Sequence, residues 1–258
     1  MVILLREVFL KAVGVIPARY DSVRFPGKPL AKICGKTMIE WVYKRVAQCK
    51  NLSSVFVATD DDRIFKEVQS FGGKCIMTPK ECISGTDRVA RASENICSDI
   101  VVNIQGDEPL IAPYSVDILV NLFKKNCDLS MGTLITPIKN KYELYDSNTV
   151  KVVVDKDFFC IYFSRSPIPY LREDKFDNFT FFKHIGIYAY KKDFLLKFSS
   201  MKQSKLEKAE KLEQLRALEN GFKIKSEIIP HWIGLSVDTP NDIVKVEEEI
   251  KKGGISPP

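Results

Sequence analysis

Histidine is scarce in this 258-residue chain, and paired cysteine motifs are missing. The only histidines are His184 and His231, and the seven cysteines are an odd number without a Cys-x-x-Cys pair. This pattern excludes a disulfide framework and a zinc site of the usual spacing. Two histidines also leave little room for Cys–His nucleophilic chemistry. Reduced thiols are the simplest interpretation, and they indicate a cytoplasmic protein.

Long apolar runs are missing as well. The segment Met1–Leu10 begins with apolar residues, but Arg6 and Glu7 interrupt it and it has no small-residue cleavage site. It is too short to span a bilayer, so we interpret it as a short extension, helical or not, before the first strand. No other stretch approaches the length of a membrane span, and we expect no membrane partner.

A strong excess of one charge is also absent. The chain has 39 Lys+Arg and 33 Asp+Glu, which gives a net charge of +6. This balance favours anionic ligands but is too small and too dispersed for a nucleic-acid surface. The Lys-rich stretch Lys202–Lys211 contains Glu207 and Glu210, which is typical of a solvated helix face. We therefore expect no nucleic-acid partner.

Apolar runs of strand length alternate with helical periodicity through the first half of the chain. This alternation is typical of repeated β-α units around a parallel sheet. It predicts an α/β fold, Rossmann-like and doubly wound with a mostly parallel sheet, in a single domain over residues 1–258. The predicted strands are Ala12–Ile16, Val55–Thr59, Lys74–Met77 and Ile100–Ile104, and the predicted helices are Met38–Lys50, Asp61–Phe71 and Arg88–Asn95.

The pattern changes over about residues 150–190, where β-branched and aromatic residues dominate. We interpret this stretch as a small mixed insertion with antiparallel strands, and we expect the interface of a homodimer there. The remaining predicted elements are a helix Ser115–Lys125, a strand Leu129–Thr136, one helix Leu206–Asn220 stopped by Gly221, a strand Lys223–Ile229 and a closing helix Asn241–Lys252.

The first predicted strand leads into a loop with three cations, Arg19, Arg24 and Lys28, together with Ser22 and a Pro-Gly turn. Open α/β sheets bind ligands at the carboxyl ends of their strands, and such a loop suits a triphosphate. The alternative is an ordinary charged surface loop.

Two acidic segments each follow an apolar segment. Asp107, in Gln105-Gly106-Asp107-Glu108-Pro109, and Asp238, in Val237-Asp238-Thr239-Pro240, are hard oxygen donors of the kind that hold Mg²⁺ beside substrate phosphates. The alternatives are a turn with solvated acids and a helix cap at Thr239 or Asn241.

Other polar positions are individually weak signals. Ser84 and Gly85 precede a helix, where backbone N–H groups bind a base or a ribose, but a plain helix cap explains them too. His184 lies in an apolar strand and suits a satisfied core histidine. Glu213 and Gln214 lie on an amphipathic helix, where a solvated position is the alternative.

Taken together, these segments resemble the 3-deoxy-manno-octulosonate (Kdo) cytidylyltransferase family, also called CMP-Kdo synthetases, from about Val13 to Val246. This family has the nucleotide-diphospho-sugar transferase type of fold. The segments that carry the resemblance are Ile16-Pro17-Ala18-Arg19-Tyr20, Arg24-Phe25-Pro26-Gly27-Lys28-Pro29-Leu30, Val57-Ala58-Thr59-Asp60, Ser84-Gly85-Thr86-Asp87-Arg88, Val102–Pro109, Tyr162-Phe163-Ser164-Arg165, Lys183-His184-Ile185-Gly186-Ile187-Tyr188, Leu212-Glu213-Gln214-Leu215-Arg216 and Gly234–Pro240.

The resemblance implies a role for each matching residue. Nucleotide contacts fall to Ala18, Arg19, Lys28, Ser84, Gly85 and Gln105, and Mg²⁺ ligands to Asp107 and Asp238. Catalysis is implied for Arg19, Lys28, Asp107 and Asp238. The pocket for Kdo is implied at Gln105, Arg165, His184, Tyr188, Glu213 and Gln214.

The implied activity is transfer of CMP from CTP to the anomeric hydroxyl of Kdo, with release of pyrophosphate, for lipopolysaccharide synthesis. The alternatives are another 2-keto sugar acid, such as sialic acid or 8-amino-Kdo, and a nucleotide-binding regulator without turnover. Retention of Asp107, Asp238 and Lys28 disfavours the regulator.

Overall fold

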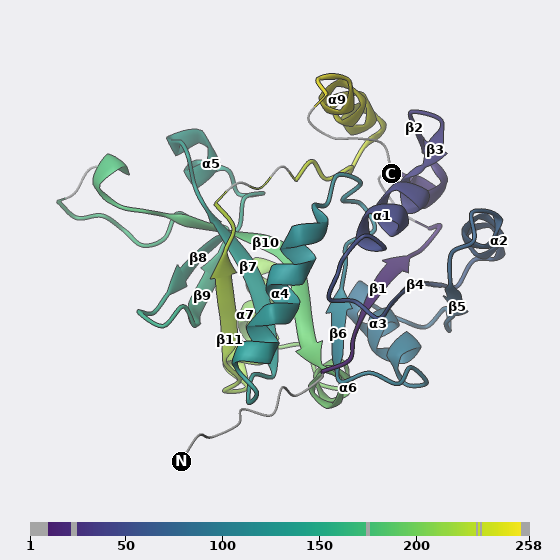
Figure 1. Ribbon diagram of the computed structural model, residues 1–258. Coiled ribbons are helices and arrows are strands. Elements are labelled where there is room, and N and C mark those ends of the chain that lie inside the picture. The colour runs from purple at the N-terminus through teal and green to yellow at the C-terminus, as the bar shows by residue number, and fades with distance from the viewer. Residues whose placement is uncertain (1–9, 22–24, 174–175, 231, 233, 254–258) are drawn as a thin grey trace, which may run out of the picture.

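A central sheet organises the computed structural model, which describes residues 10–21, 25–173, 176–230, 232 and 234–253. Its strands lie in the order β11-β7-β10-β6-β1-β4-β5 (Figure 1). Their bounds are β1 Ala12–Ala18, β4 Ser54–Thr59, β5 Cys75–Met77, β6 Ile100–Asn103, β7 Met131–Pro137, β10 Phe182–Lys191 and β11 Ile224–Ile228. The expected extension Met1–Leu10, except for Leu10, lies outside the described residues, as do Ser22 and Arg24.

The predicted doubly wound α/β fold is confirmed. Strand β1 pairs in parallel with β4 on one side and with β6 on the other, and β4 pairs in parallel with β5. The chain thus adds β4 and β5 on one side of β1 and then returns to add β6 on the other side. The strand order reverses between β1 and β6, and in open α/β sheets such a switch point is where ligands bind.

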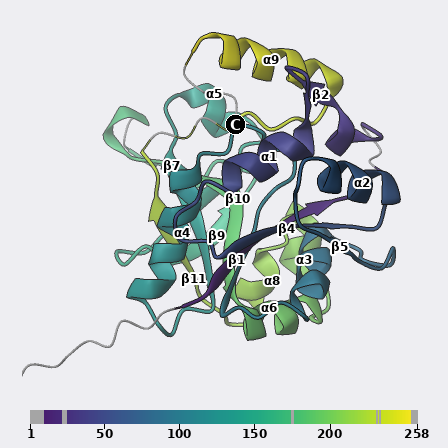
Figure 2. The same ribbon diagram turned by 45° about the vertical axis from the view of Figure 1, so that its right-hand side comes forward.

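Helices cover both faces of the sheet (Figures 1 and 2). One face packs against α1 (Met38–Val46), α2 (Asp62–Ser70) and α4 (Pro113–Lys125), and the other against α3 (Gly85–Ser93), α6 (Lys192–Ser199) and α8 (Leu215–Glu219). Thr37 and Asp61 cap α1 and α2 by accepting hydrogen bonds from backbone N–H groups. None of the described helices has both the length and the apolar character that a bilayer crossing requires.

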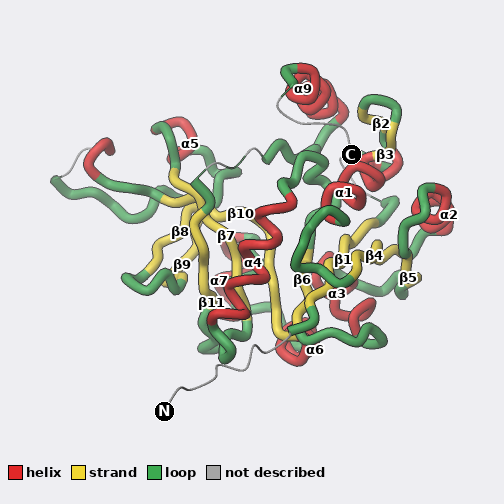
Figure 3. Tube along the Cα trace, viewed as in Figure 1, coloured by secondary structure: helices red, strands yellow, loops and turns green. Residues whose placement is uncertain are grey.

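The aromatic-rich stretch 150–190, expected to be a small mixed insertion, also supplies a strand of the central sheet. Only β8 (Lys151–Val154) and β9 (Cys160–Ser164) branch off the central path, whereas β10 lies between β7 and β6 and pairs antiparallel with both. Figure 3 shows β10 as a long strand in the middle of the sheet. A central strand is covered on both faces, which explains its apolar and aromatic composition.

The single helix predicted over Leu206–Asn220 is wrong. The structure has α7 (Lys205–Glu210) and α8, separated at Lys211, whose φ of 56° is left-handed. The turn lets Leu212 and Leu215 both enter the core. Gly221, with a φ of 79°, follows α8 as the predicted stop.

The remaining elements lie at the edges. They are the 3₁₀ helices η1 (Lys28–Leu30) and η2 (Phe176–Asn178), the short strands β2 (Lys32–Ile33) and β3 (Lys36–Thr37), and the helices α5 (Lys141–Tyr145) and α9 (Pro240–Lys251). Buried residues of α9 and α1 form a separate small core with Ile33, Leu110 and Val237. This core fixes the segment that carries Asp238.

Candidate active site

Two loops meet at the switch point of the sheet. One leaves β1 at Arg19, and the other leaves β6 and carries Gln105 and Asp107. Gly106 allows the two loops to approach, because a Cβ atom there would lie 2.9 Å from the carbonyl oxygen of Pro17. The glycine is therefore required by packing, and it sets the position of Asp107 beside the β1 loop.

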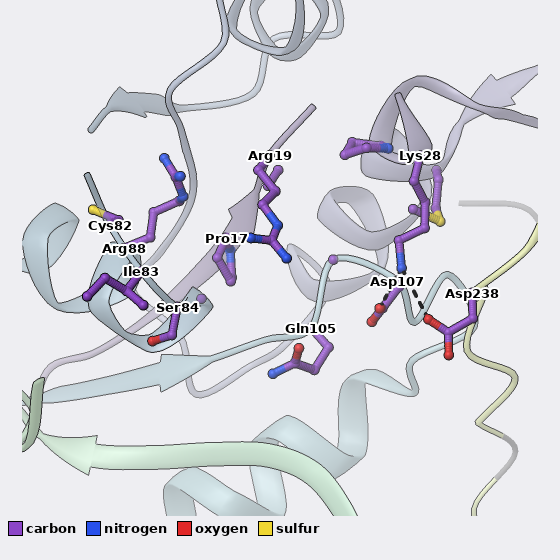
Figure 4. Close-up of a pocket in the computed structure, with 15 residues that line it drawn as sticks. Pro17, Arg19, Lys28, Cys82, Ile83, Ser84, Arg88, Gln105, Asp107 and Asp238 are labelled. Carbon is purple, nitrogen blue, oxygen red and sulfur yellow. Dashed lines mark hydrogen bonds and ion pairs between the residues drawn. The ribbon is translucent and has the colours of Figure 1, made fainter. Parts of the chain in front are cut away.

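Lys28 reaches both predicted metal-binding acids. Its Nζ donates to Oδ2 of Asp107 at 2.8 Å and lies 3.7 Å from Oδ1 of Asp238. The loop turns toward this position at Gly27, whose φ of 72° is left-handed and whose N–H donates to the carbonyl of Tyr20. The three charged side chains form one cluster, shown with its contacts in Figure 4.

The backbone of Val237 holds this cluster together. Its N–H donates to the carbonyl of Asp107 at 2.9 Å, and its carbonyl accepts from Nζ of Lys28 at 2.9 Å. The Val237 side chain is fully buried, and Thr239 begins α9 in a capping box with Asp242. The predicted cap at Thr239 is thus present and leaves the Asp238 side chain directed at Lys28.

The cluster lies at one end of a cavity of about 270 Å³. Ser84 lies on one side of Arg19, and Lys28 with the two acids lies on the other (Figure 4). Arg19 has no ion-pair partner in the described part of the chain, so its guanidinium is available to an anion. Of the residues expected to contact a nucleotide, the cavity is lined by Ala18, Arg19, Lys28, Ser84, Gly85 and Gln105.

Ser84 opens helix α3 at the other end of the cavity. Its hydroxyl accepts from the N–H of Asp87, and Asp87 accepts from the N–H of Ser84, which completes a capping box. The plain helix cap is therefore real. It is compatible with ligand binding, because the N–H groups of Gly85 and Thr86 have no partner among the described residues and can face an anion or a base.

The acid pair fits a hard divalent cation. Both carboxylates already surround one cationic group, the Lys28 ammonium, and all of their donor atoms are oxygens. Among the described residues there is no group of three or more His, Cys, Asp or Glu side chains that could hold a metal. Two carboxylates completed by substrate phosphates is the arrangement that Mg²⁺ commonly uses.

Glu108, which follows Asp107 in the chain, has an unusual environment for a carboxyl group. Burial raises the pKa of Glu108 to about 8, and the charges of Asp107 and Asp238 act in the same direction. Its Oε2 is buried without a hydrogen-bond partner in the described part of the protein. The pKa of the acid beside Asp107 is thus held well above that of an ordinary carboxyl, which the sequence alone did not indicate.

His184 and Tyr188 lie side by side on β10 because the strand bulges between them. The register pairs His184 with Ile135 but Tyr188 with Thr133, so four steps on β10 match two on β7. In a regular strand these residues would lie about 13 Å apart, yet their ring centroids are 5.2 Å apart. Nε2 of His184 contacts the Thr133 hydroxyl at 2.9 Å, as a satisfied core histidine would.

Glu213 connects the sugar-pocket candidates to the nucleotide loop. Its Oε2 accepts from the Thr86 hydroxyl at 3.0 Å, and its Oε1 lies 3.5 Å from Ser84 Oγ. Burial raises the pKa of Glu213, while the hydrogen bond from Thr86 and the charge of Arg216 lower it. The Glu213 side chain is half-buried, with 30% of its surface exposed, so it is neither fully solvated nor part of the core. Gln214 is buried, which excludes the solvated position considered for it, and its Nε2 has no partner among the described residues.

Arg165 follows β9 and is held by Glu210. Its backbone N–H donates to Oε2 of Glu210 at 2.9 Å, its Nε donates to the Glu210 carbonyl at 2.8 Å, and its Nη1 donates to the Ser147 carbonyl at 2.9 Å. These hydrogen bonds orient the guanidinium. No hydrogen bond joins Arg165 to the other sugar-pocket candidates within the residues described.

Arg88 and Val237 are site residues that sequence reasoning did not single out. Arg88 lines the cavity and is buried, with its guanidinium donating to Asp60 at 2.8 Å and to Thr78 at 2.6 Å. Arg88 lies one turn into α3, after Ser84, and this position in the sequence could have identified it as a site residue. No local signal identifies Val237, because its contacts are made by its backbone.

Comparisons with known proteins agree with this geometry. The family model described as "Cytidylyltransferase" matches residues 13–226. The 3-deoxy-manno-octulosonate cytidylyltransferase of Fusobacterium nucleatum is 51% identical over 95% of this chain and 99% of its own length, and that of Syntrophotalea carbinolica is 49% identical over 92% and 98%.

A solved structure extends the agreement to three dimensions. CMP:2-keto-3-deoxy-manno-octonic acid synthetase complexed with CTP is 43% identical and superimposes with a TM-score of 0.89, covering 94% of this chain and 99% of that chain. A Leptospira borgpetersenii cytidylyltransferase, 19% identical with a TM-score of 0.65 over 96% of this chain and 89% of that chain, shares the fold alone. The chain therefore belongs to the 3-deoxy-manno-octulosonate cytidylyltransferase family of nucleotidyltransferases.

Proposed function

We propose that this chain transfers CMP from CTP to the anomeric hydroxyl of Kdo in a magnesium-dependent reaction, giving CMP-Kdo and pyrophosphate. The observation that carries the proposal is the convergence of Asp107 and Asp238 on Lys28 beside Arg19, in one cavity with the Ser84 turn. Acids and bases from three distant segments meet there. The acids suit a metal ion, and the bases suit the triphosphate that the metal accompanies.

In the proposed reaction, the anomeric oxygen of Kdo forms a bond to the α-phosphorus of CTP while the bond to the β-phosphate bridging oxygen breaks. Arg19 and Lys28 stabilise the negative charge of the departing pyrophosphate. Asp107 and Asp238 would hold Mg²⁺, which would offset charge on the triphosphate and make the hydroxyl more acidic. The proton of the hydroxyl passes to solvent, and no dedicated side-chain base is proposed.

On the other side of the reaction centre, the sugar acid contacts Gln105, His184, Tyr188, Glu213 and Gln214. Arg165 pairs with the sugar carboxylate through its planar fork, a geometry that lysine does not offer. The hydrogen bonds from Arg165 to Glu210 and Ser147 support this role, because they orient the guanidinium before any ligand arrives. Sialic acid and 8-amino-Kdo are disfavoured as substrates, since the relatives at 43–51% identity are named for Kdo.

We further propose that the enzyme acts in the cytoplasm as a homodimer and supplies lipopolysaccharide synthesis. Seven free cysteines support a reducing compartment. The dimer interface is proposed around β8, β9 and α5, where Tyr142, Tyr145, Ile161 and Tyr170 are each at least 59% exposed. Exposed aromatic and large apolar residues gathered in one region are typical of protein interfaces.

The decisive experiment measures pyrophosphate release from CTP with Mg²⁺, offering Kdo, 8-amino-Kdo or sialic acid. We expect turnover with Kdo, and loss of turnover on chelation of Mg²⁺. Asp107→Asn and Asp238→Asn should each reduce kcat by on the order of 10²-fold or more, whereas Asp128→Asn, at an exposed acid, should not. Normal turnover in both site variants would refute the assignment.

A further inference from the structure

The hydroxyl of Thr133 lies at the centre of the bulge in β10. It contacts the carbonyl of Ile187 at 2.8 Å, the carbonyl of Ile185 at 3.3 Å and Nε2 of His184 at 2.9 Å. The Thr133 side chain is fully buried. One hydroxyl therefore joins both halves of the bulge to the imidazole ring.

The chemistry of these partners fixes the direction of each hydrogen bond. A carbonyl oxygen can only accept, and a threonine hydroxyl has a single proton. That proton is used on Ile187, with a weaker share on Ile185. Toward His184 the hydroxyl oxygen can then only accept, so Nε2 of His184 must carry a hydrogen.

Two aromatic rings flank the imidazole. Phe163 packs edge-on at a centroid distance of 5.1 Å, and Tyr188 packs at 5.2 Å. The backbone N–H of His184 donates to the Val150 carbonyl. Burial lowers the pKa of His184 to about 3, so the ring is neutral at physiological pH. Nδ1 then has no hydrogen, and it has no partner among the described residues.

We propose that Thr133 is a positioning residue that holds His184 in the Nε2–H tautomer, so that Nδ1 accepts a hydrogen bond from a hydroxyl of the sugar acid. The sugar contact rests on the proposed function, whereas the tautomer depends on the protein alone. Thr133 thereby selects for a sugar hydroxyl that donates a hydrogen bond to Nδ1. A group that can only accept would be repelled by the lone pair of Nδ1.

The tautomer can be read directly by NMR of the ligand-free enzyme with ¹⁵N-labelled histidine. The chain has only two histidines, and His184→Gln assigns the signals by removing one set. We expect the Nε2 resonance at the protonated position and Nδ1 far downfield, at the unprotonated position. A protonated Nδ1 in the wild-type enzyme would overturn the role of Thr133, whatever the substrate is.

Kinetics test the consequence for the sugar. Thr133→Val removes the hydroxyl at similar volume, and Thr133→Ser keeps it as the matched control. We expect Thr133→Val to mix the tautomers and raise KM for Kdo roughly five- to tenfold, the effect of one hydrogen bond, with KM for CTP unchanged. Thr133→Ser should restore both readouts. An unchanged Kdo KM in His184→Gln overturns the placement of the sugar beside His184, while the NMR result still decides the tautomer.

Discussion

The ammonium of Lys28 lies 2.8 Å from Oδ2 of Asp107, in an ion pair between residues 79 positions apart. The same ammonium is 3.7 Å from Oδ1 of Asp238. Lys28 thus supplies a positive charge that keeps the two carboxylates close together. A metal-triphosphate would take over this task and leave Lys28 to bind phosphate.

Lys28→Met should therefore have two effects. We expect KM for CTP to rise and kcat to fall, because a phosphate-binding charge is lost. We also expect a melting temperature lower by roughly a few degrees, because the two carboxylates then repel each other, and Mg²⁺ should restore more of it than it adds to the wild type. Thermal unfolding with and without MgCl₂ measures this, and an equal Mg²⁺ effect on both proteins would contradict it.

Arg165→Lys keeps the positive charge but loses the planar fork. The lysine cannot reproduce both hydrogen bonds that hold the guanidinium to Glu210 and Ser147. We expect KM for Kdo to rise about tenfold, with KM for CTP largely retained, in steady-state assays that vary each substrate in turn. An unchanged Kdo KM would remove Arg165 from the sugar pocket.

Arg216 and Glu207 form a buried ion pair that fixes α7 against α8. Arg216 donates from Nη2 at 2.6 Å and from Nε at 2.9 Å, and both residues are 5% exposed. Arg216→Met would leave the Glu207 charge buried without its partner, so we expect unfolding to become easier by about 3–5 kcal/mol. Denaturant unfolding measures this loss.

The matched control is Arg91→Met, which breaks the exposed pair with Glu94. Exposed pairs contribute little, and the same measurement should show almost no change. Similar losses in both variants would mean that burial does not decide the strength of the Arg216 pair.

The partly buried His184 should make the stability of the fold depend on pH. Its folded pKa is lowered by burial to about 3, below the unfolded value near 6.5. Below pH 6.5 the unfolded chain binds a proton that the folded protein does not, so stability is lost as pH falls toward 3.

Near pH 5 this contribution is on the order of 1–2 kcal/mol. His184→Gln should remove this contribution. The free energy of unfolding should therefore fall less in the variant than in the wild type between pH 7 and pH 5. Unfolding free energies at several pH values test this, and a constant difference across the range would show that His184 is not kept neutral by burial.

Local sequence patterns predicted the parts of this protein that local physics controls. Apolar runs predicted β1, β4, β5 and β6 within one or two residues, because buried strands need continuous apolar side chains. Gly221 and Thr239 marked helix ends, since Gly221 adopts a left-handed backbone and Thr239 forms a capping box with Asp242, three residues away. The positions of Lys28 and Asp107 also followed, because loops at the carboxyl ends of parallel strands converge.

Only the tertiary structure decided the contacts that depend on the order of the strands. Val237 ties Lys28, 209 positions away, to Asp107 through backbone groups that carry no sequence signal. The break at Lys211 has neither glycine nor proline, and it exists because Leu212 and Leu215 both enter the core. The bulge that joins His184 to Tyr188 depends on pairing with β7, since a strand by itself has no register.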